Sequence, residues 1–402
     1  MKSITSKFKF MAIAALVLTT AIAIHSCKKS SSGPTTPTVT STTLAAGASV
    51  TAGTSTGFTI TGTNLTSATV TTTTTGITIT NVTVNAGGTS ITGTVSVNAA
   101  VASGTITLTI TTAQGTASAT FTVVGLPLLG GYLSSDSVAY SNLISYFTFN
   151  GNVNDTIGNQ TGTGVGVTYI AGVRGQAYQG ATGAYATVPA SSAFASLASY
   201  SVSLWYNLPQ AAKPQPATKA AGIFFVSGDT TGSHGNEIIV ETDVPSTTQY
   251  AADSVPIHHG FDNVGGAGGT WQNFTMNSFD TATSTWVHIV MTYDGPSSAY
   301  TYYENGQPVA VSSAYGVSTS TILLNGPGPL GGSTGLQGNL NFTEDNPTTL
   351  FIGTWPPGLY GVSPTLGSAG CFLGAIDELR VFNRALTQQE VVGLFLNGQA
   401  GR

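Results

Sequence analysis

Three acidic residues on one short segment offer the strongest basis for catalysis in this chain of 402 residues. The segment NEIIVETDV favours a strand, and its two-residue period places Glu237, Glu241 and Asp243 on one face. Neighbouring positions on that face lie about 7 Å apart, close to the carboxylate separation that glycoside hydrolysis uses. The segment could therefore carry the acids of a glycosidase.

A possible metal site lies in the segment PIHHGFDN, through His258, His259 and Asp262. A zinc site needs three or four converging ligands, and usually carboxylates that orient them, so one short segment supplies too few. We therefore expect a polar loop there. No G-x-S-x-G segment accompanies the Ser, His and Asp residues, which leaves acyl transfer without support.

Aromatic residues in two Gly- and Pro-rich segments could bind a sugar. Trp271 lies in GGTWQNF, and Trp355 and Tyr360 lie in GTWPPGLYG, where we expect exposed turns. A ring presented there could stack on a sugar, or it could instead be a loop anchor buried against the domain. Trp355 is the first choice for binding, because two prolines follow it and restrict the backbone.

The composition predicts an all-β protein. Charged residues make up only 7% of the chain, and Thr, Ser, Gly and Asn take their place. Thr, Val, Ile and aromatic residues favour strands, while Gly and Asn favour turns. Nucleic acid is not an expected partner, because the net charge is -5 and no basic stripe follows the first 30 residues.

The N-terminus has the pattern of a targeting segment. Lys2, Lys7 and Lys9 precede an apolar run, residues 10–24, which has the length of a signal-peptide core. The ending IHSC, followed by lysines and serines, resembles a bacterial lipoprotein signal. That resemblance implies cleavage before Cys27, its acylation, and anchoring at the outer membrane of a bacterial envelope, on either face. The alternative is an ordinary secretory signal.

Three segments are expected before the C-terminal domain. Residues 28–41 are rich in Ser, Thr and Pro and predict a flexible tether. Residues 42–125 alternate apolar and hydroxyl residues, and the stretch from Ser30 to Ser135 contains no Asp, Glu, Lys, Arg or His. This region resembles an immunoglobulin-like domain of the TIG/IPT type and is expected to be a spacer. Residues 126–142 predict a linker.

Residues 143–398 carry the most specific patterns. Asn305-Gly306 between two β-rich runs predicts a hairpin, and Thr387 and Glu390 form a T-x-x-E capping box for a short terminal helix. The ordered segments SVSLWYNL, STWVHIVMTYDG, AYTYYENGQPVAV and GCFLGAIDELRVF resemble the laminin-G-like family of the concanavalin type. The resemblance implies a jelly-roll β-sandwich, here with long insertions at residues 208–236 and 312–348.

The same resemblance argues against catalysis. Hydrolases of the laminarinase kind in this fold carry Glu-x-Asp-x-x-Glu on such a strand, and Glu241 and Asp243 match the first two acids. Ser246 stands where the acid/base Glu should be, so the leaving group would lack a proton donor. We therefore expect no enzymatic activity.

A structural calcium ion is predicted beside Asp377. The resemblance implies that the first strand, residues 143–149, pairs with residues 376–382 and brings the loop 150–155 close to Asp377. That loop offers Asp155, asparagines and carbonyl oxygens, which are ligands that calcium prefers. The alternative is that Asp377 caps a turn by hydrogen bonding.

Together these patterns predict a non-catalytic envelope lipoprotein whose C-terminal domain binds a glycan or a surface protein in adhesion. A structural or protein-binding surface component is the alternative. A glycoside hydrolase is the third candidate function.

Overall fold

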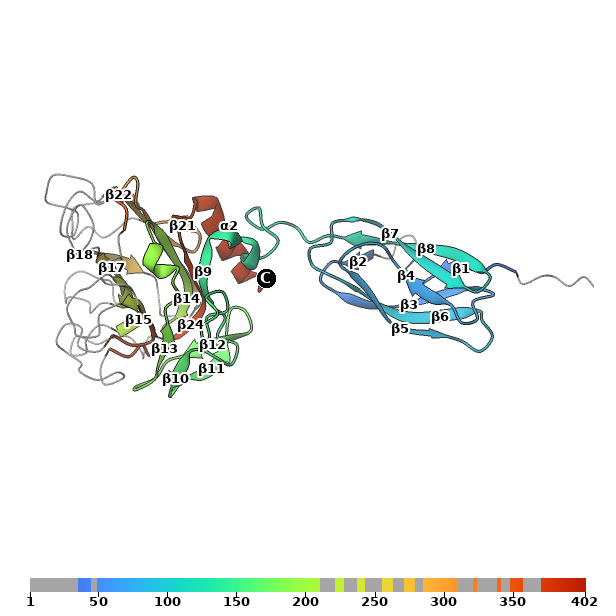
Figure 1. The fold of residues 1–402 in the computed structure, drawn as a ribbon, viewed down its shortest axis with the longest axis horizontal. Helices are drawn as coiled ribbons and strands as arrows, with labels where there is room; N and C mark the ends of the chain where they lie inside the picture. Colours follow the sequence, from blue (N-terminus) through green and yellow to red (C-terminus); the bar gives the residue numbers. More distant parts are fainter. Residues whose placement is uncertain are drawn as a thin grey trace, which may run out of the picture. The chain divides into compact units, whose positions relative to one another are not determined.

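The computed structural model describes residues 35–44, 49–209, 221–227, 237–242, 255–262, 271–278, 285–309, 321–323, 338–340, 348–356 and 370–402. The chain divides into two compact units, Met1–Leu126 and Pro127–Arg402 (Figure 1). The predicted signal segment, Cys27 and most of the tether lie outside the described residues. In the described ranges, no helix has the length and apolarity needed to cross a membrane.

The first unit is a sandwich of two four-stranded sheets, ordered β1-β3-β6-β5 and β2-β8-β7-β4. The strands are β1 (Thr38–Thr42), β2 (Ser49–Thr51), β3 (Ser55–Thr63), β4 (Thr69–Thr71), β5 (Ile77–Val84), β6 (Ser90–Val97), β7 (Gly104–Thr112) and β8 (Gly115–Val124). Alternating residues such as Ile60, Ile91 and Val95 are fully buried between the sheets. The predicted small β-sandwich is confirmed, whereas its TIG/IPT resemblance stays a prediction.

The edge strands of the first unit are short or irregular. Strands β2 and β4 have only three residues each. Strand β1 shifts register between Val39 and Ser41. Strand β5 shifts between Thr80 and Thr83, where Asn81 has a φ of 55°. Each of the four edges therefore offers only a brief or interrupted row of backbone hydrogen-bonding groups.

The second unit is a larger sandwich, which confirms the predicted all-β jelly roll with one C-terminal helix. One sheet has seven strands in the order β10-β13-β23-β15-β16-β17-β18. Its strands are β10 (Thr163–Val165), β13 (Tyr185–Pro189), β15 (Ala221–Ser227), β16 (Glu237–Thr242), β17 (Val255–Asp262), β18 (Trp271–Ser278) and β23 (Thr349–Ile352).

The other sheet has nine strands. Seven follow the order β11-β12-β24-β14-β19-β20-β21, while β9 pairs with β24 and β22 pairs with β20. They are β9 (Leu143–Phe147), β11 (Thr168–Ala171), β12 (Gln176–Gln179), β14 (Tyr200–Asn207), β19 (Val287–Asp294), β20 (Ala299–Glu304), β21 (Gln307–Pro308), β22 (Thr321–Leu323) and β24 (Ala375–Phe382). The antiparallel pairing of β9 with β24 confirms the predicted neighbours.

The core of the second unit lies between these two sheets. Val202, Leu204 and Tyr206 of β14 face it, as the alternation of SVSLWYNL predicts, and Ile238 and Val240 of β16 line it from the other sheet. All five side chains are fully buried. Burial of each contributes roughly 1.5–3 kcal/mol, so this interface is the main stabilising element of the unit.

Local signals for a hairpin and a helix are also confirmed. Asn305 and Gly306 both have positive φ, 48° and 81°, and join β20 to β21. Helix α2 (Gln388–Gln399) begins after Thr387, whose hydroxyl accepts a hydrogen bond from the backbone N–H of Glu390. The Glu390 carboxylate accepts one in return from the backbone N–H of Thr387, at 2.8 Å.

The residues predicted as a linker, 126–142, instead belong almost entirely to the second unit. They contain the short 3-10 helices η1 (Ser135–Ser137) and η2 (Tyr140–Asn142); a third, η3 (Phe194–Ser196), precedes β14. Val138 is 1% exposed and packs with Leu143 and Val391. The backbone N–H of Ser135 donates to the carbonyl of Arg402, so the two ends of the unit meet.

Strand β24 departs from strict alternation at Glu378. The pairing with β14 shifts register between Ser203 and Trp205, and Glu378 has a φ of 49°, unusual for a residue with a side chain. Alternation predicts Ile376 and Glu378 on one face. The bulge instead leaves Ile376 and Leu379 both in the core, with the acidic pair Asp377 and Glu378 between them.

Candidate functional site

The seven-stranded sheet carries several of the residues singled out from the sequence. Ile238 and Val240 of β16 lie in the core, so alternation assigns Glu237, Ile239 and Glu241 to the opposite face. Strand β16 confirms the predicted strand, whereas the shared face of the three acids stays a prediction. Asp243 and Ser246 lie outside the described residues.

Pairing across β16, β17 and β18 sets these positions in rows. Glu237 is directly opposite Asp262, and Asp262 is opposite Trp271. We name Glu237, Asp262 and Trp271 the acidic row. Opposite residues of antiparallel strands have Cα atoms about 4.5–5.5 Å apart, so each row forms a continuous strip. Four residues along the strands, Glu241 is opposite His258.

The segment PIHHGFDN is strand β17 and not the predicted polar loop. His259 is fully buried in the core. Its Nε2 lies 3.0 Å from the Tyr200 hydroxyl, and its ring stacks on Tyr300 with centroids 5.1 Å apart. The side chains of His258 and Asp262 lie outside the described part of the structure. Because successive residues of a strand alternate between faces, adjacent positions 258 and 259 are poorly placed to share one metal ion.

The three candidate aromatic residues have different settings. Trp271 begins strand β18, so the exposed turn predicted for it is wrong. Trp355, which follows β23, is only 4% exposed, and a Cβ on Gly370 would lie 2.6 Å from its Cδ2. Trp355 therefore lacks the exposure needed to stack on a sugar. Its indole is instead a buried loop anchor, which was the alternative expected from the sequence. Tyr360 lies outside the described residues.

Two phenylalanines that the sequence analysis did not select share this sheet face. Phe225 of β15 is paired with Phe351 of β23 on one side and with Ile239 on the other. All three side chains are buried, although they alternate with core residues. The alternation in AGIFFVS and TLFI could have indicated them. The face therefore combines an apolar strip with the acidic row beside it.

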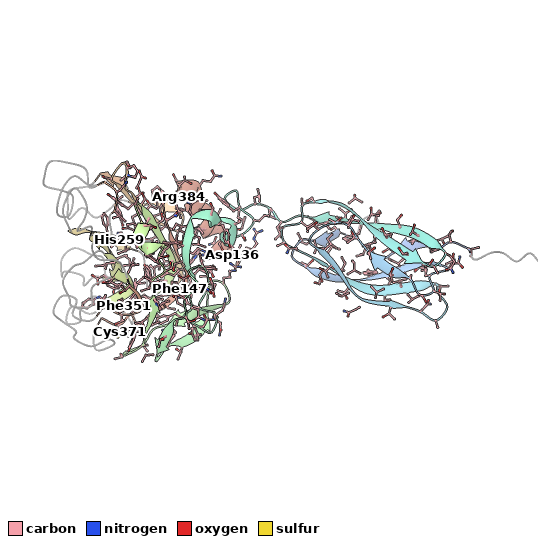
Figure 2. The ribbon with its side chains drawn as sticks, in the orientation of Figure 1. Asp136, Phe147, His259, Phe351, Cys371 and Arg384 are labelled. Atoms are coloured by element: carbon pink, nitrogen blue, oxygen red, sulfur yellow. The ribbon has the colours of Figure 1, made fainter. Side chains whose placement is uncertain are left out.

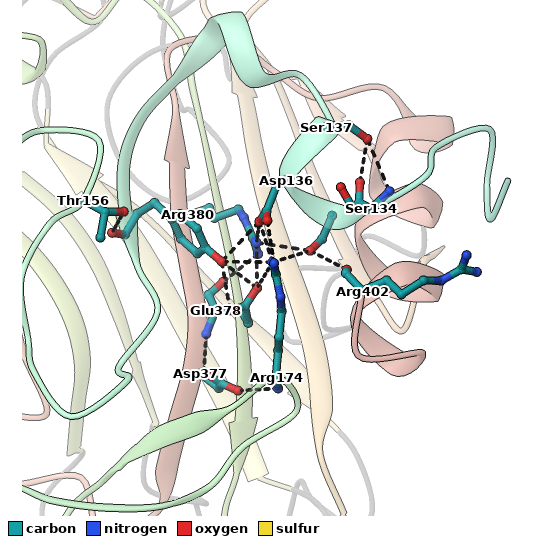
Figure 3. A network of polar contacts seen from close by, with 11 residues as sticks. Ser134, Asp136, Ser137, Thr156, Arg174, Asp377, Glu378, Arg380 and Arg402 are labelled. Atoms are coloured by element: carbon teal, nitrogen blue, oxygen red, sulfur yellow. Dashed lines mark hydrogen bonds and ion pairs between the residues drawn. The ribbon is translucent and has the colours of Figure 1, made fainter. Parts of the chain in front are cut away.

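A second group of polar residues lies on the nine-stranded sheet (Figure 3). Both Oδ atoms of Asp136 accept hydrogen bonds of 2.6 Å from Arg174. Arg380 donates to Glu378 at 2.6 Å and to Asp136 at 3.0 Å, and its guanidinium lies 4.1 Å from the centre of the Tyr146 ring. The Tyr146 hydroxyl donates to Glu378 at 2.9 Å.

The electrostatics of this group are those of a closed network. Burial would raise the pKa of Asp136, but hydrogen bonds and charge from Arg174 and Arg380 outweigh it and lower that pKa. Burial raises the pKa of Tyr146, so its hydroxyl stays protonated. Because the acids and arginines already satisfy each other, we assign the network to stability and not to chemistry.

The two predicted calcium ligands accept backbone hydrogen bonds in different turns. Asp155 Oδ1 accepts from the N–H groups of Tyr146, Ile157 and Gly158. Asp377 accepts from Arg174 at 3.1 Å and from Glu378 at 2.9 Å. Within the described ranges, no three His, Cys, Asp or Glu side chains gather closely enough to hold a metal. These contacts fit the turn-capping alternative better than a shared ion, and calcium binding stays a prediction.

Figure 2 places the side chains of the second unit, including Phe351 and Cys371. Cys371 is free and half-buried, next to Gly222 of β15 through an isolated bridge. Strand β17 carries His259 into the interior of the same unit.

Residues 180–340 match the family model described as the concanavalin A-like lectin/glucanases superfamily. This part of the chain is a concanavalin A-like domain. The match spans β13 to β22 and so includes the acidic row. It confirms the predicted family for the C-terminal domain. A comparison with curated proteins finds no match.

The solved structures that match this chain share little sequence with it. The CBM40 of Ruminococcus gnavus IT-sialidase bound to alpha2,6 sialyllactose is 10% identical, with a TM-score of 0.33, covering 50% of this chain and 84% of its own. A heptameric SAP-like pentraxin of Limulus polyphemus is 14% identical, with a TM-score of 0.30, covering 50% and 70%. A Trypanosoma rangeli sialidase in complex with sialic acid is 14% identical, with a TM-score of 0.40, covering 73% and 42%.

Proposed function

We propose that the second unit is a non-catalytic carbohydrate-binding module, and that the edge of its seven-stranded sheet at β17 and β18, next to the buried outer face of β15, β16 and β23, holds the ligand. The observation that carries this proposal is the family match over residues 180–340, which covers five of the seven strands of that sheet, β17 and β18 included. Fold alone does not define a ligand, so the chemistry of the face must supply the rest of the argument.

The acidic row combines two groups that suit a sugar. Trp271 supplies an aromatic residue in register with Asp262 and Glu237, whose carboxylates are hydrogen-bond acceptors for sugar hydroxyls. Aromatic stacking contributes of order 1 kcal/mol per ring beyond area burial. A site of this kind has a dissociation constant in the ~micromolar to millimolar range.

The charge distribution favours an uncharged glycan over an acidic one. The seven strands of this sheet contain Glu237, Glu241 and Asp262 but no Lys or Arg. On the other side of the described unit, Arg174, Arg380 and Arg384 are all engaged in ion pairs with Asp136, Glu378 and Glu390. An acidic sugar on the outer face would meet like charge without a compensating arginine.

We further propose that the chain is anchored to the outer membrane of a bacterial envelope through acylated Cys27. Weak single-site binding suits such an arrangement, because many copies on one membrane gain avidity. Hydrolysis is not part of the proposal, since Ser246 occupies the position of the acid/base residue in the resembling hydrolases.

The test is a glycan array followed by calorimetry on the full chain. Neutral oligosaccharides should bind the wild type, and sialyllactose should not. Trp271→Ala should lose binding, while Tyr140→Ala, which removes an aromatic side chain that is 62% exposed outside this face, should retain it. Equal binding by both variants would place the site elsewhere, and binding to no glycan would favour a structural or protein-binding role. Released sugars in the same samples would establish a hydrolase.

A further inference from the structure

The outer face of sheet β2-β8-β7-β4 in the first unit consists almost entirely of Thr and Ser. Ile106, Leu108 and Phe121 face the core, and every residue that alternates with them from Thr105 to Thr111 and from Thr116 to Thr122 carries a hydroxyl. The register sets them directly opposite one another: Thr105 with Thr122, Thr107 with Thr120, Thr109 with Ser118, and Thr111 with Thr116. We name these residues the hydroxyl array.

The neighbouring strands extend the array across the sheet. Thr69 and Thr71 of β4 are paired with Thr111 and Thr109, and Ser49 of β2 is paired with Thr122. All residues of the array are exposed except Thr109, which is half-buried. Two-residue steps along a strand are about 6.8 Å and steps between strands about 4.8 Å, so the hydroxyls form a regular grid.

The hydroxyls of the array are not used by the protein itself. Within the described residues, none of them makes a side-chain hydrogen bond. The other sheet of the same unit behaves differently, because Ser55 donates to Ser96 at 2.7 Å and Thr38 lies 2.8 Å from Thr63, hydroxyl to hydroxyl. In the array no hydroxyl is engaged in this way, whereas the other sheet pairs several of its hydroxyls with one another.

The array is also free of charge and preorganised. No Asp, Glu, Lys, Arg or His occurs from Ser30 to Ser135. Threonine is β-branched and stiff at χ1, so its hydroxyl and methyl group lose little freedom when they bind. A partner that matches this surface must itself be uncharged and must repeat donors and acceptors at similar spacing. The water lattice at an ice surface has these properties, and ionic side chains do not fit into it.

We propose that the hydroxyl array binds ice. The proposal is independent of carbohydrate binding by the second unit, since it concerns another sheet and another ligand. Thr hydroxyls occupy positions equivalent to lattice water, and the methyl groups between them fill the spaces of the lattice surface. Strands β7 and β8 form the longest pairing in the sheet and make the main contact.

The test is ice recrystallisation of the purified full chain in a buffer matched for every additive. The wild type should keep ice crystals smaller than buffer alone does. The double variant Thr107→Lys with Thr120→Lys should lose this inhibition, because it places ammonium groups in the centre of the array. Thr107→Val with Thr120→Val keeps the shape and strand preference but removes two hydroxyls, and should weaken the inhibition.

The matched control is Thr59→Lys with Thr92→Lys, a directly paired position on the other sheet of the same unit. It should retain full inhibition. Thermal melting of each variant checks that the sandwich is folded. Crystals as large as in buffer with the wild type would overturn the proposal, and so would equal loss in the array and control variants.

Discussion

Asp136 and Arg174 form a two-pronged ion pair in which both oxygen–nitrogen distances are 2.6 Å. The pair joins the segment that begins the second unit to the turn between β11 and β12. Arg380 reaches the same carboxylate at 3.0 Å, so Asp136 serves two guanidinium groups.

We expect Asp136→Asn to lower the free energy of unfolding of the second unit by about 1–2 kcal/mol, because a half-exposed charged pair is lost beside a buried arginine. Chemical denaturation of Asp136→Asn, Arg174→Gln and the double variant measures the coupling. A coupling energy of about 0.5 kcal/mol or more is expected. Strictly additive effects would show that the pair contributes nothing.

Removal of residues 127–142 should destabilise the second unit. Asp136 then no longer meets Arg174, Val138 leaves the cluster with Val391, and the Arg402 carbonyl loses its bonds from Ser135. Together these losses amount to roughly 3 kcal/mol or more. Fragments 127–402 and 143–402 can be compared by thermal melting. Equal melting temperatures would restore the view of this segment as a linker.

Asp377 should make the second unit less stable as pH rises. Burial raises the pKa of its carboxyl to about 7, against the opposing hydrogen bonds of Arg174 and Glu378. The folded state therefore prefers the protonated acid. The contribution of Asp377 to the free energy of unfolding is complete below the unfolded pKa of about 3.9 and is lost as pH rises through about 7.

His288 has the opposite effect on stability. Burial lowers its pKa to about 3, so its contribution to the free energy of unfolding is lost as pH falls below about 6.5.

The difference between wild type and Asp377→Asn isolates the carboxyl from His288. From about pH 4 to pH 8 the variant should gain about 1–3 kcal/mol relative to wild type. Urea unfolding across this range measures the gain. A difference that is constant with pH would contradict the assignment.

Trp355→Ala should lower the stability of the second unit, and this should be its main effect rather than a direct loss of sugar binding. The indole is 4% exposed and lies against Gly370, so truncation leaves a cavity that costs about 3–5 kcal/mol. Trp355→Phe, which keeps an aromatic ring, should cost less. Wild-type stability of Trp355→Ala would show that the ring is not an anchor and return it to the candidates for sugar stacking.

Chelation tests the calcium ion predicted from sequence. If Asp155 and Asp377 act only by accepting hydrogen bonds, then EDTA leaves the melting temperature unchanged. A fall in melting temperature with EDTA would establish the ion if added calcium reverses the fall and if the Asp377→Asn variant does not show it. Magnesium added in place of calcium is the control for charge.

Alternation was sufficient to predict β14 and its inward residues, because Val202, Leu204 and Tyr206 alternate with polar or outward residues without interruption. It was insufficient at β24, where the bulge at Glu378 adds a residue that no local pattern reveals. Local sequence does not reveal strand β17, because its histidines and Gly260 have little strand preference and its place in the sheet comes from pairing on both sides. The linker error has a similar cause, since Asp136 gains its role from arginines far along the chain.

The edges of the first unit have a consequence for the conditions in which the chain can operate. Many proteins keep sheet edges apart with lysines, and that protection weakens when salt screens the charge or when pH removes it. Here three-residue strands and register shifts provide the protection, and both are properties of the backbone. Neither salt nor pH changes strand length or register, so these edges keep their protection against edge-to-edge pairing under conditions that would weaken protection by charge.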